Sequence, residues 1–578
     1  MKTEICPQKN SILESEKLKV FIGEDGNIIS LLDKINNIEF VRWKNIFRKD
    51  GLQIWIKEGF VGRDPNGYLS HKFSEIIFAQ SSIKKENSKI IIEKNKNDEK
   101  FEILYDLKDY LDILTTLKNL GERKFKQFEF FFSWEIPAGT NILVPGKNRY
   151  FRYIVPPFGR IITRYFKFYN KPIYIIRPDK NGIKIEFSEL LRYVIYNRGK
   201  MCVVGGFTNI KRVDKNKSIS ENIKISLYKS KNIKKITEDD NFVLPGPLKN
   251  PYFKKRFIHI SLYYKRVDLN NFFKIIKNLN RIGYNGVILG IGKGMKFESY
   301  PEISEEWSYS KKEMKEINDY IKSIGMEIIP EFPTLGHQND TNLVKVDPEI
   351  VEDPKNPFVY CTSNPKTYQV IFSILEEIID IFKPEIMHLT HDEVQHWFSK
   401  KRMGICNRCK NRKLWEIYSE DVNKLHSFLF KKNIRMSLWG DMLLDHRKFK
   451  ICNCNGAVGD VYKAIDLIPK DIIIFDWHYH YYKKYPSLDY FLNKGFKVFP
   501  ATSFFNPKAV ASFCRYAKKI GLNDGVIETT WAVPVIEELP IENIFISSQI
   551  FQNPEINLNK IKNISLKFAL YLYKEVKK

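Results

Sequence analysis

The second half of the chain alternates short apolar segments with longer segments of helical period, and this alternation constrains the fold more than any other feature. Eight apolar segments have the length and composition of buried strands. They are Phe257–Leu262, Gly286–Leu289, Glu327–Glu331, Ile386–Thr390, Arg435–Leu438, Ile472–Phe475, Lys497–Pro500 and Gly525–Glu528. The helical segments between them include Asn270–Arg281, Lys311–Ile324, Lys366–Phe382, Glu416–Lys432 and Pro507–Ile520.

Apolar strands joined by crossover helices form parallel sheets that are covered on both faces. Eight such units in about 290 residues predict an α/β fold of the (β/α)8 TIM barrel type. A doubly wound open sheet is the alternative, because the count of eight requires every short apolar segment to be a strand.

The first part of the chain has a different pattern. Short segments such as Lys89–Glu93 and Gln127–Trp134 alternate apolar and polar residues between turn signals, which is typical of antiparallel strands. The segment Leu244–Pro251 carries three prolines and one glycine and indicates a boundary. We therefore predict a non-catalytic β-rich domain over residues 1–245 and a barrel with a C-terminal helix over residues 252–578.

Composition and charge exclude some classes of protein. The 43% hydrophobic content excludes an intrinsically disordered chain. The net charge of +26 is compatible with nucleic-acid binding, but the basic residues are mainly lysines scattered among Asn and Ile, as between Lys84 and Asn97. We interpret this charge as background composition and expect neither a nucleic-acid nor a membrane partner.

The location in the cell is predicted from the N-terminus and the cysteines. Met1 to Asn10 contain no apolar run, so no signal peptide is visible, and no segment is long enough for a membrane helix. The eight cysteines are too sparse for a disulfide-stapled secreted domain. We therefore expect a cytoplasmic protein with reduced thiols.

Acids, histidines and tryptophans gather where the predicted strands end, which is where a barrel of this type carries its active site. The residues are Glu331, His337, His388, Asp392, Glu393, Trp439, Asp441, Trp477, Glu528 and Trp531. A tryptophan face matches the apolar face of a pyranose ring, and carboxylates match its hydroxyl groups. The pattern predicts a sugar-binding site.

The segment Met387–Val394, which reads MHLTHDEV, is the most informative of these strand ends. One carboxylic acid of the Asp392–Glu393 pair can protonate a glycosidic oxygen, while the other stays ionised and raises the pKa of its neighbour. The alternative is an acidic pair that caps the next helix. The surrounding histidines and tryptophans favour the catalytic interpretation.

Together these residues resemble glycoside hydrolase family 20, the β-N-acetylhexosaminidases. The family signature His-x-Gly-Gly-Asp-Glu is matched by His388, Asp392 and Glu393, and Pro330-Glu331 with Gly336-His337 is similar to its third-strand motif. Arg256 stands where the family keeps an arginine for the sugar hydroxyls. The resemblance covers about residues 252 to 540, and it places Trp439, Trp477 and Trp531 around the sugar.

The resemblance implies a retaining exo-glycosidase that acts on oligosaccharides or glycoconjugates without a cofactor or a catalytic metal. The seventh predicted strand ends in Ala501-Thr502-Ser503-Phe504, with no carboxylate nucleophile. This fits substrate-assisted catalysis, in which the 2-acetamido carbonyl of the substrate attacks. Glu393 would then be the general acid and base, and Asp392 would hold the acetamido N–H. We expect Glu528 to bind a hydroxyl, or to serve as the fallback nucleophile.

Three departures from the family pattern leave alternatives open. Thr390-His391 replaces the glycine pair and adds bulk beside the acids, Ser261 replaces an Asp, and Phe504 replaces a tyrosine that positions the acetamido group. Tyr479 or Tyr481 could substitute for that tyrosine. A β-glycosidase without an acetamido requirement, an inactive sugar-binding homologue and a nucleic-acid-binding protein are the alternatives.

The cysteines form a competing motif. Cys406-x-x-Cys409 and Cys452-x-Cys454 both fall in predicted loops, and paired cysteines of this kind bind structural zinc. The second spacing is shorter than usual, so a structural zinc stays an alternative to four free thiols.

Overall fold

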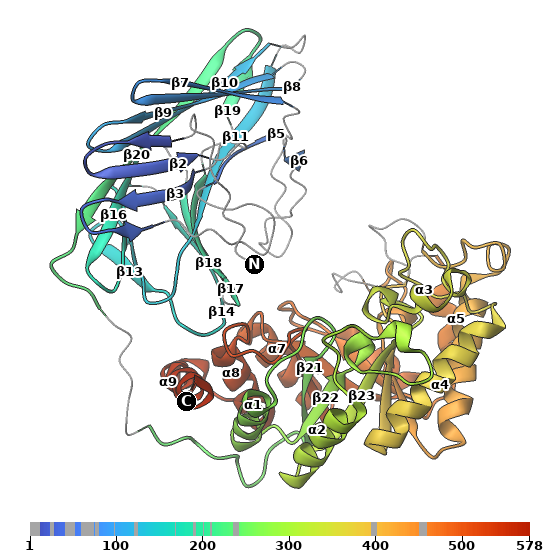
Figure 1. Cartoon of the computed structure of the whole chain (residues 1–578). Helices are drawn as coiled ribbons and strands as arrows, with labels where there is room; N and C mark the ends of the chain where they lie inside the picture. The colour runs from blue at the N-terminus through green and yellow to red at the C-terminus, as the bar shows by residue number, and fades with distance from the viewer. Residues whose placement is uncertain are drawn as a thin grey trace. The chain divides into compact units, whose positions relative to one another are not determined.

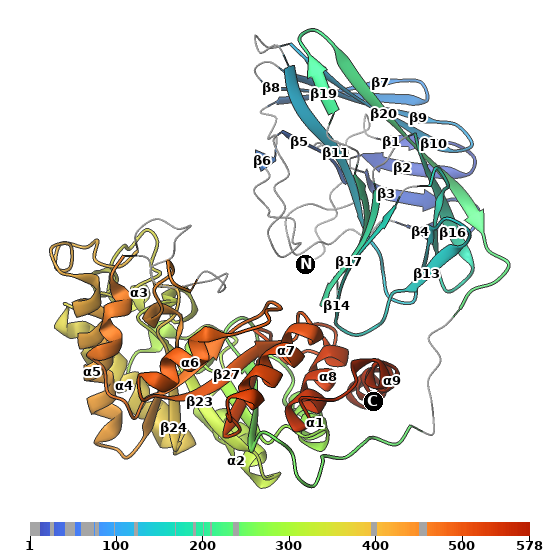
Figure 2. The ribbon, with the colours of Figure 1, turned by 180° about the vertical axis from the view of Figure 1, so that it is seen from behind.

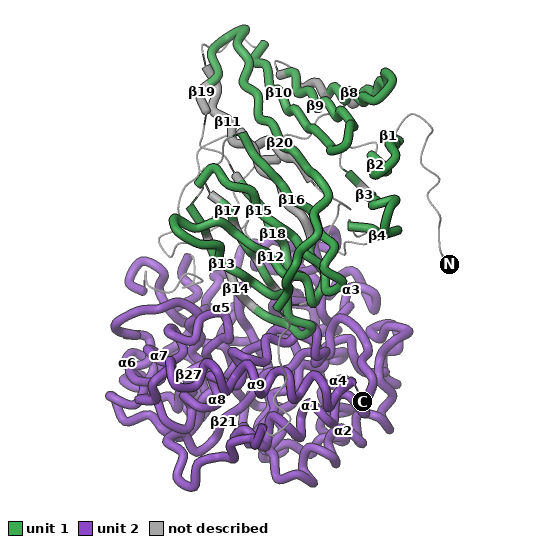
Figure 3. The backbone as a smooth tube through the Cα atoms, turned by 90° about the vertical axis from the view of Figure 1, so that its left-hand side faces the viewer, with its two compact units in different colours: residues 1–237 green, residues 238–578 purple. Residues whose placement is uncertain are grey.

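The computed structural model describes residues 12–22, 28–40, 53–58, 74–75, 80–96, 99–120, 125–167, 169–188, 192–199, 201–207, 211–234, 242–394, 402–449 and 459–577. The chain divides into two compact units, Met1–Thr237 and Glu238–Lys578 (Figure 3). The segment Leu244–Pro251, where we predicted a boundary, follows this division and contains neither helix nor strand. Within the described ranges no helix is long and apolar enough to cross a membrane.

The first unit is built of strands (Figure 1). They form a four-stranded, a nine-stranded and a seven-stranded sheet, with antiparallel pairs such as β9 with β10 and β17 with β18. The first ten are β1 Ile12–Glu14, β2 Leu18–Ile22, β3 Ile28–Asp33, β4 Ile38–Glu39, β5 Gln53–Glu58, β6 Ser74–Glu75, β7 Gln80–Glu86, β8 Lys89–Lys96, β9 Glu99–Leu107 and β10 Leu111–Asn119. The others are β11 Phe125–Glu135, β12 Asn141–Pro145, β13 Tyr150–Ile154, β14 Arg160–Lys167, β15 Ile173–Ile176, β16 Asn181–Phe187, β17 Arg192–Gly199, β18 Met201–Phe207, β19 Lys211–Asp214 and β20 Ser218–Lys229.

The predicted β-rich character of this region is confirmed. Lys89–Glu93 and Gln127–Trp134 fall inside β8 and β11, and alternate side chains of β10 are buried, as the alternating sequence pattern requires. The buried residues of the sheets form one hydrophobic core.

The second unit contains a closed barrel of eight parallel strands. They are β21 Lys255–Ser261, β22 Gly286–Gly290, β23 Glu327–Thr334, β24 Ile386–Thr390, β25 Arg435–Trp439, β26 Ile473–Trp477, β27 Lys497–Ser503 and β28 Gly525–Thr529. The last strand pairs with the first, Lys255 opposite Gly525 and His259 opposite Thr529. The barrel prediction is therefore confirmed, and the open-sheet alternative is wrong because the sheet has no free edge.

Helices surround the barrel (Figures 1 and 2). They are α1 Leu269–Arg281, α2 Lys311–Ser323, α3 Leu343–Val346, α4 Pro365–Phe382, α5 Leu414–Phe430, α6 Pro486–Asn493, α7 Pro507–Lys519, α8 Ile541–Gln552 and α9 Leu558–Lys577. Local sequence sets several of their ends. Ser310 and Glu313 form a capping box at the start of α2, and Asn364 caps α4 ahead of Pro365.

Side chains alternate between the barrel interior and the helical layer along each strand. Phe257, Ile288, Ile329, Ile386, Trp439, Ile473, Phe475, Phe499, Ala501 and Ile527 form the interior cluster, with Trp477 and Trp531 packed against it. A residue two positions further along a strand points the same way. Glu331 and His388 therefore share the interior with Ile329 and Ile386, at the C-terminal end of the barrel.

Candidate active site

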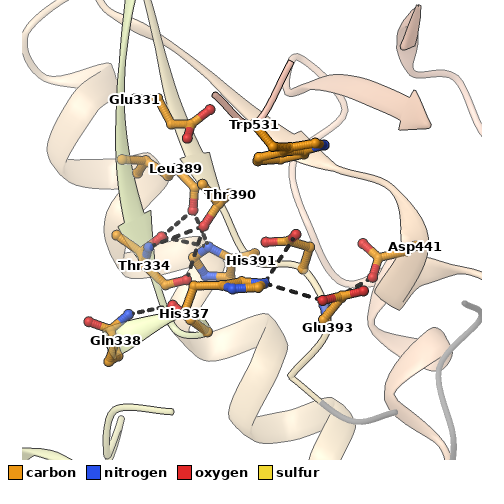
Figure 4. Close-up of polar contacts among 12 residues, drawn as sticks. Glu331, Thr334, His337, Gln338, Leu389, Thr390, His391, Glu393, Asp441 and Trp531 are labelled. Carbon is orange, nitrogen blue, oxygen red and sulfur yellow. Dashed lines mark hydrogen bonds and ion pairs between the residues drawn. The ribbon is translucent and has the colours of Figure 1, made fainter. Parts of the chain in front are cut away.

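Asp392 and Glu393 follow β24, and the imidazole of His337 pairs with both carboxylates. Figure 4 shows His337 pointing toward Glu393. His337 Nε2 is 3.4 Å from Asp392 Oδ2 and 3.5 Å from Glu393 Oε2. His337 belongs to the loop after β23, and Gly336 allows this loop to come close, since a Cβ there would lie 2.6 Å from the carbonyl oxygen of Asp392. The structure thus brings together three of the predicted residues from two strand ends.

Burial and neighbouring charges change the ionisation of His337 and Glu393. Burial favours the neutral imidazole, but the carboxylates of Asp392 and Glu393 outweigh it and raise the pKa of His337 to about 9. Burial also raises the pKa of Glu393, and the neighbouring Asp392 adds to this, while His337 and Arg402 act against it. Glu393 therefore holds its proton to higher pH than an ordinary glutamate does, with a cationic imidazole beside it.

We expect His337→Gln to shift the pH profile of kcat/KM toward alkaline pH by about one unit, because removing a neighbouring cation raises the pKa values of carboxylic acids. The limb that Glu393 sets should move, since His337 contacts its carboxylate. Profiles for the wild type and the variant check this. His426→Gln is the control, because His426 pairs with Asp471 ahead of β26, at the other end of the barrel. Coinciding profiles for the wild type and His337→Gln would refute the coupling.

Asp441 is a second buried carboxyl beside the pair, in the turn after β25. Its Oδ2 accepts a hydrogen bond from the backbone N–H of Glu393 at 3.0 Å. Burial first, and then the carboxylate of Asp392, hold the pKa of Asp441 well above its usual range. The hydrogen bond from Glu393 to Asp441 thus fixes the backbone beside the acid pair.

Glu331 lies inside the barrel, at the end that carries Asp392 and Glu393, and is fully buried. Its carboxylate is 3.2 Å from His259 Nε2 and 3.8 Å from His388 Nε2, and it accepts a hydrogen bond from the hydroxyl of Tyr263. Burial opposes its ionisation, but His259, His388 and Tyr263 together lower the pKa of Glu331 to about 2. Glu331 is thus an ionised group held in place from three sides.

His388 is one layer of an aromatic stack in the barrel interior. Its ring lies 4.5 Å from Trp439 and 4.7 Å from Phe475, and its Nδ1 is 3.1 Å from the hydroxyl of Ser437. Burial lowers the pKa of His388 to about 4, so the ring is neutral at neutral pH. This position indicates that His388 holds the side chains of Glu331 and Trp439 in place.

The three predicted tryptophans also gather at this end. Trp531 lies 5.6 Å from Trp439 between ring centroids and donates from Nε1 to the hydroxyl of Tyr479 at 2.9 Å. Tyr479 lies in turn 4.9 Å from Trp477. From the sequence, Tyr479 and Tyr481 were equal candidates to substitute for the family tyrosine that Phe504 replaces. The structure places Tyr479 among the tryptophans, whereas Tyr481 is 55% exposed.

The backbone that carries the acids is held in an unusual conformation. Thr390, His391 and Glu393 have φ angles of 48°, 66° and 54°, in the left-handed region that favours glycine. The family pattern has glycine at the first two of these positions. Here the added side chains point away from the acids: the Thr390 hydroxyl meets the backbone of Thr334, and His391 Nε2 lies 2.8 Å from Asp421 Oδ2 on α5.

The residues that support the site from behind carry no signal in the sequence. Asp421 accepts hydrogen bonds from Tyr360 at 2.8 Å and Tyr368 at 2.7 Å, besides its contact with His391. His259 and Tyr263, which hold Glu331, were not among the predicted site residues either. These supporting residues share no local motif with the residues that they hold, so only the fold brings them together.

Arg256 does not lie with these residues. It belongs to the start of β21, at the opposite end of the barrel, and its guanidinium donates to the carbonyl oxygens of Gly283 and Phe253 at 2.6 Å each and of Lys254 at 3.0 Å. The expected contact with sugar hydroxyls has no support in this position. Arg256 instead ties together the segments that precede β21 and β22.

Glu528 is also separate from the site, because its neighbour Ile527 faces the barrel interior and Glu528 faces the helices. The hydroxyls of Thr502 and of Ser547 on α8 donate to its carboxylate. Burial raises the pKa of Glu528 to about 8, against the opposing effect of these two hydroxyls. Neither the expected role at a sugar hydroxyl nor the role of fallback nucleophile fits this orientation.

The predicted zinc motif is only partly within the described residues. Cys452 and Cys454 lie outside them, whereas Cys406 and Cys409 lie in the loop before α5. A third cysteine that no motif indicated, Cys361, contacts both.

A known family of catalytic domains matches part of this barrel. Residues 291–505 match the model "Glycosyl hydrolase family 20, catalytic domain", which is less than half of the chain. The matched range begins after β22 and ends after β27, and it includes His337, Asp392, Glu393 and Asp441. The barrel thus contains a hexosaminidase-like domain of the family 20 type. Arg256 and Glu528 lie outside the matched range.

Curated relatives are similar over part of the chain. A "Probable beta-hexosaminidase" of Arthroderma benhamiae is 27% identical over 180 residues, covering 26% of this chain and 29% of the relative. A "Beta-hexosaminidase" of Akkermansia muciniphila is 24% identical over 194 residues, covering 31% and 37%. The chain thus spans about a third of the length of these relatives. Among solved structures, the exo β-N-acetylglucosaminidase of Vibrio harveyi aligns with a TM-score of 0.44 and 11% identity, covering 82% of this chain and 97% of that one.

Proposed function

We propose that this barrel is a retaining exo-glycosidase that removes terminal β-linked N-acetylhexosamine by substrate-assisted catalysis. Glu393 protonates the leaving glycosidic oxygen and later activates water, and Asp392 orients the 2-acetamido group of the substrate. The family match and the similarity to β-hexosaminidases support a glycoside hydrolase. The assignment of residues rests on the geometry of the site.

The observation that carries the proposal is the state of Asp392. The residue is 6% exposed, and its Oδ2 is held by His337, but its Oδ1 is buried without a hydrogen-bond partner. A buried carboxylate oxygen is costly to leave unpaired. The N–H of a 2-acetamido group supplies the missing donor and would be held next to Glu393.

The surrounding atoms also favour a polar ligand. Trp439 Nε1, Ser261 Oγ and Ser503 Oγ are buried without a hydrogen-bond partner, and all three belong to residues at the C-terminal ends of barrel strands. Sugar hydroxyls both donate and accept, so they can pair with such groups while the pyranose face lies against the tryptophans. The same arrangement has little to offer a nucleic acid, because its cationic imidazole, His337, is already paired with the carboxylates of Asp392 and Glu393.

The position of Glu528 supports catalysis by the substrate itself. A retaining enzyme with its own nucleophile needs a second carboxyl group about 5 to 5.5 Å from the acid. Glu528 was the carboxylate considered for that role at the end of the barrel sheet, and it faces α8. In β27 and β28, which the structure describes in full, no other side chain is a carboxylate.

We expect Tyr479→Phe to lower kcat for N-acetyl substrates by about tenfold or more, the effect of losing one hydrogen bond to a charged transition state. The Tyr479 hydroxyl accepts a hydrogen bond from Trp531 and lies among the tryptophans, so we assign it the role of the family tyrosine that Phe504 replaces, which is to position the acetamido carbonyl. Steady-state kinetics check this. Tyr481→Phe, at an exposed position of the same loop, is the matched control. Equal kcat values for the two variants would assign the role elsewhere.

Hydrolysis of three aryl glycosides tests the proposed function: the β-N-acetylglucosaminide, the β-glucoside and the β-galactoside. We expect turnover of the N-acetyl sugar alone. Turnover of the other two would favour the β-glycosidase alternative. Binding of N-acetylglucosamine without hydrolysis of any glycoside would favour the inactive sugar-binding homologue.

A further inference from the structure

Three cysteine sulfurs converge beside the barrel in a cluster that the glycosidase chemistry does not use. The Sγ atom of Cys361 lies 3.4 Å from that of Cys406 and 3.7 Å from that of Cys409. All three sulfurs lie within 4.8 Å of one another, and all three cysteines are free. Cys361 and Cys409 are buried and Cys406 is partly exposed. The cluster is therefore compact and shielded.

These separations match those of thiolates around one metal ion. A tetrahedral zinc site with Zn–S bonds of about 2.3 Å places its sulfurs roughly 3.8 Å apart. Three thiols without a metal gain little from the contacts between their sulfur atoms, whereas a divalent ion that prefers soft ligands forms a bond with each of the three sulfurs. We propose that Cys361, Cys406 and Cys409 bind a structural zinc ion.

The backbone around the cysteines is built to present them. The N–H groups of Cys409 and Lys410 donate to the carbonyl oxygen of Cys406 at 3.1 and 2.9 Å, and this turn brings the two sulfurs of the Cys-x-x-Cys pair to the same side. The carboxylate of Glu352 accepts from the N–H groups of Gly404, Ile405 and Cys406 at 2.8 to 3.0 Å. The sulfurs are thus positioned before any ion arrives.

Polar groups around the sulfurs are suited to thiolate ligands. The Ser363 hydroxyl lies 3.2 Å from the Sγ of Cys409 and accepts a hydrogen bond from Arg412 at 2.9 Å. The Cys409 thiol donates to this hydroxyl, and the hydroxyl can donate in the opposite direction once the sulfur is a thiolate. Arg412 and Arg408 also interact with the cysteine sulfurs, although Glu420 and Glu349 pair with these arginines. Groups of this kind orient metal ligands and tune their affinity.

The zinc would hold two active-site loops together. Cys361 ends the loop that runs from His337 to α4, and Cys406 and Cys409 lie in the loop that runs from the Asp392–Glu393 pair to α5. A metal that joins these loops stabilises the folded barrel, since the unfolded chain has no preformed site.

Metal analysis of the full chain tests the proposal. Protein purified under reducing conditions without chelators should contain about one zinc per chain, and a thiol-blocking mercurial should release it. Cys361→Ser and Cys409→Ser should each lower the zinc content by about tenfold or more, and Ser363→Ala should weaken zinc affinity by about tenfold. Cys514→Ser is the matched control, because Cys514 is a buried free cysteine of α7 in the same unit.

Cobalt replacement covers the case in which the cysteine variants do not fold. The wild-type chain, stripped of metal and given Co²⁺ chloride, should develop the thiolate-to-cobalt charge-transfer bands of a sulfur-rich tetrahedral site. Zinc-free purified protein that takes up neither Zn²⁺ nor Co²⁺ would overturn the proposal. A disulfide among the three cysteines in reduced protein, or full zinc content in Cys361→Ser, would overturn it as well.

Discussion

Glu393→Gln is expected to lower kcat/KM for an N-acetylhexosaminide with a poor leaving group by roughly 10² to 10⁴-fold, the usual contribution of a general acid. The glutamine keeps the size of the side chain and its backbone hydrogen bond to Asp441, but it has no proton to give to the glycosidic oxygen. The loss should become smaller as the leaving group becomes more acidic, because a good leaving group departs without protonation. A series of aryl glycosides measures this dependence.

Glu327→Gln is the matched control for this experiment. Glu327 begins β23 at the opposite end of the barrel, where it pairs with Lys255 and is about half exposed. We expect wild-type kinetics from it. If kcat/KM of Glu393→Gln falls equally for every leaving group, the substitution has damaged the site in another way than by removing a proton donor. If hydrolysis is undiminished, Glu393 is not the general acid.

Asp421→Asn is expected to destabilise the barrel by about 3 kcal/mol or more, within the range for breaking a buried charged network. Asp421 is fully buried and takes hydrogen bonds from two tyrosines besides its contact with His391. An asparagine has one acceptor oxygen in place of two, so at least one buried donor loses its partner. Urea unfolding followed by the helical circular dichroism signal measures the change, since the described helices all belong to the second unit.

The catalytic activity of Asp421→Asn should fall together with the stability of the barrel, because the Asp421 carboxylate also supports the left-handed backbone at Thr390 and His391. Asp380→Asn is the matched control, an exposed aspartate near the end of α4, and it should change stability by no more than about 0.5 kcal/mol. If the Asp421 and Asp380 variants unfold at the same urea concentration, the network contributes nothing and the strained backbone is held by other contacts.

Strand positions could be predicted from the sequence because buried parallel strands are continuous apolar segments. The prediction for β24, Ile386–Thr390, agrees with the structure at both ends, and the other seven barrel strands differ by a few residues. Residues that follow a strand, such as Asp392 and Glu393, were therefore placed at the correct end of the barrel.

The errors arose where the direction of a side chain decides its role. Glu528 follows an interior residue and so faces the helices, and Arg256 lies at the start of its strand. A strand buried on both faces has no polar side to reveal which residues point inward. Asp421 and Cys361 could not be found for another reason, since their partners are 30 and 45 residues away and only the fold unites them.

The measurement that tests the central claim most directly uses substrates whose acetamido group carries an increasing number of fluorine atoms, with the leaving group unchanged. Fluorine withdraws electrons from the carbonyl oxygen and weakens it as a nucleophile. If this oxygen attacks the sugar beside Asp392, kcat should fall with each fluorine. For the trifluoroacetyl compound it should fall by about tenfold or more, which corresponds to a rise of about 1.4 kcal/mol in the activation free energy. A kcat that stays constant across the series would contradict substrate-assisted catalysis by this protein.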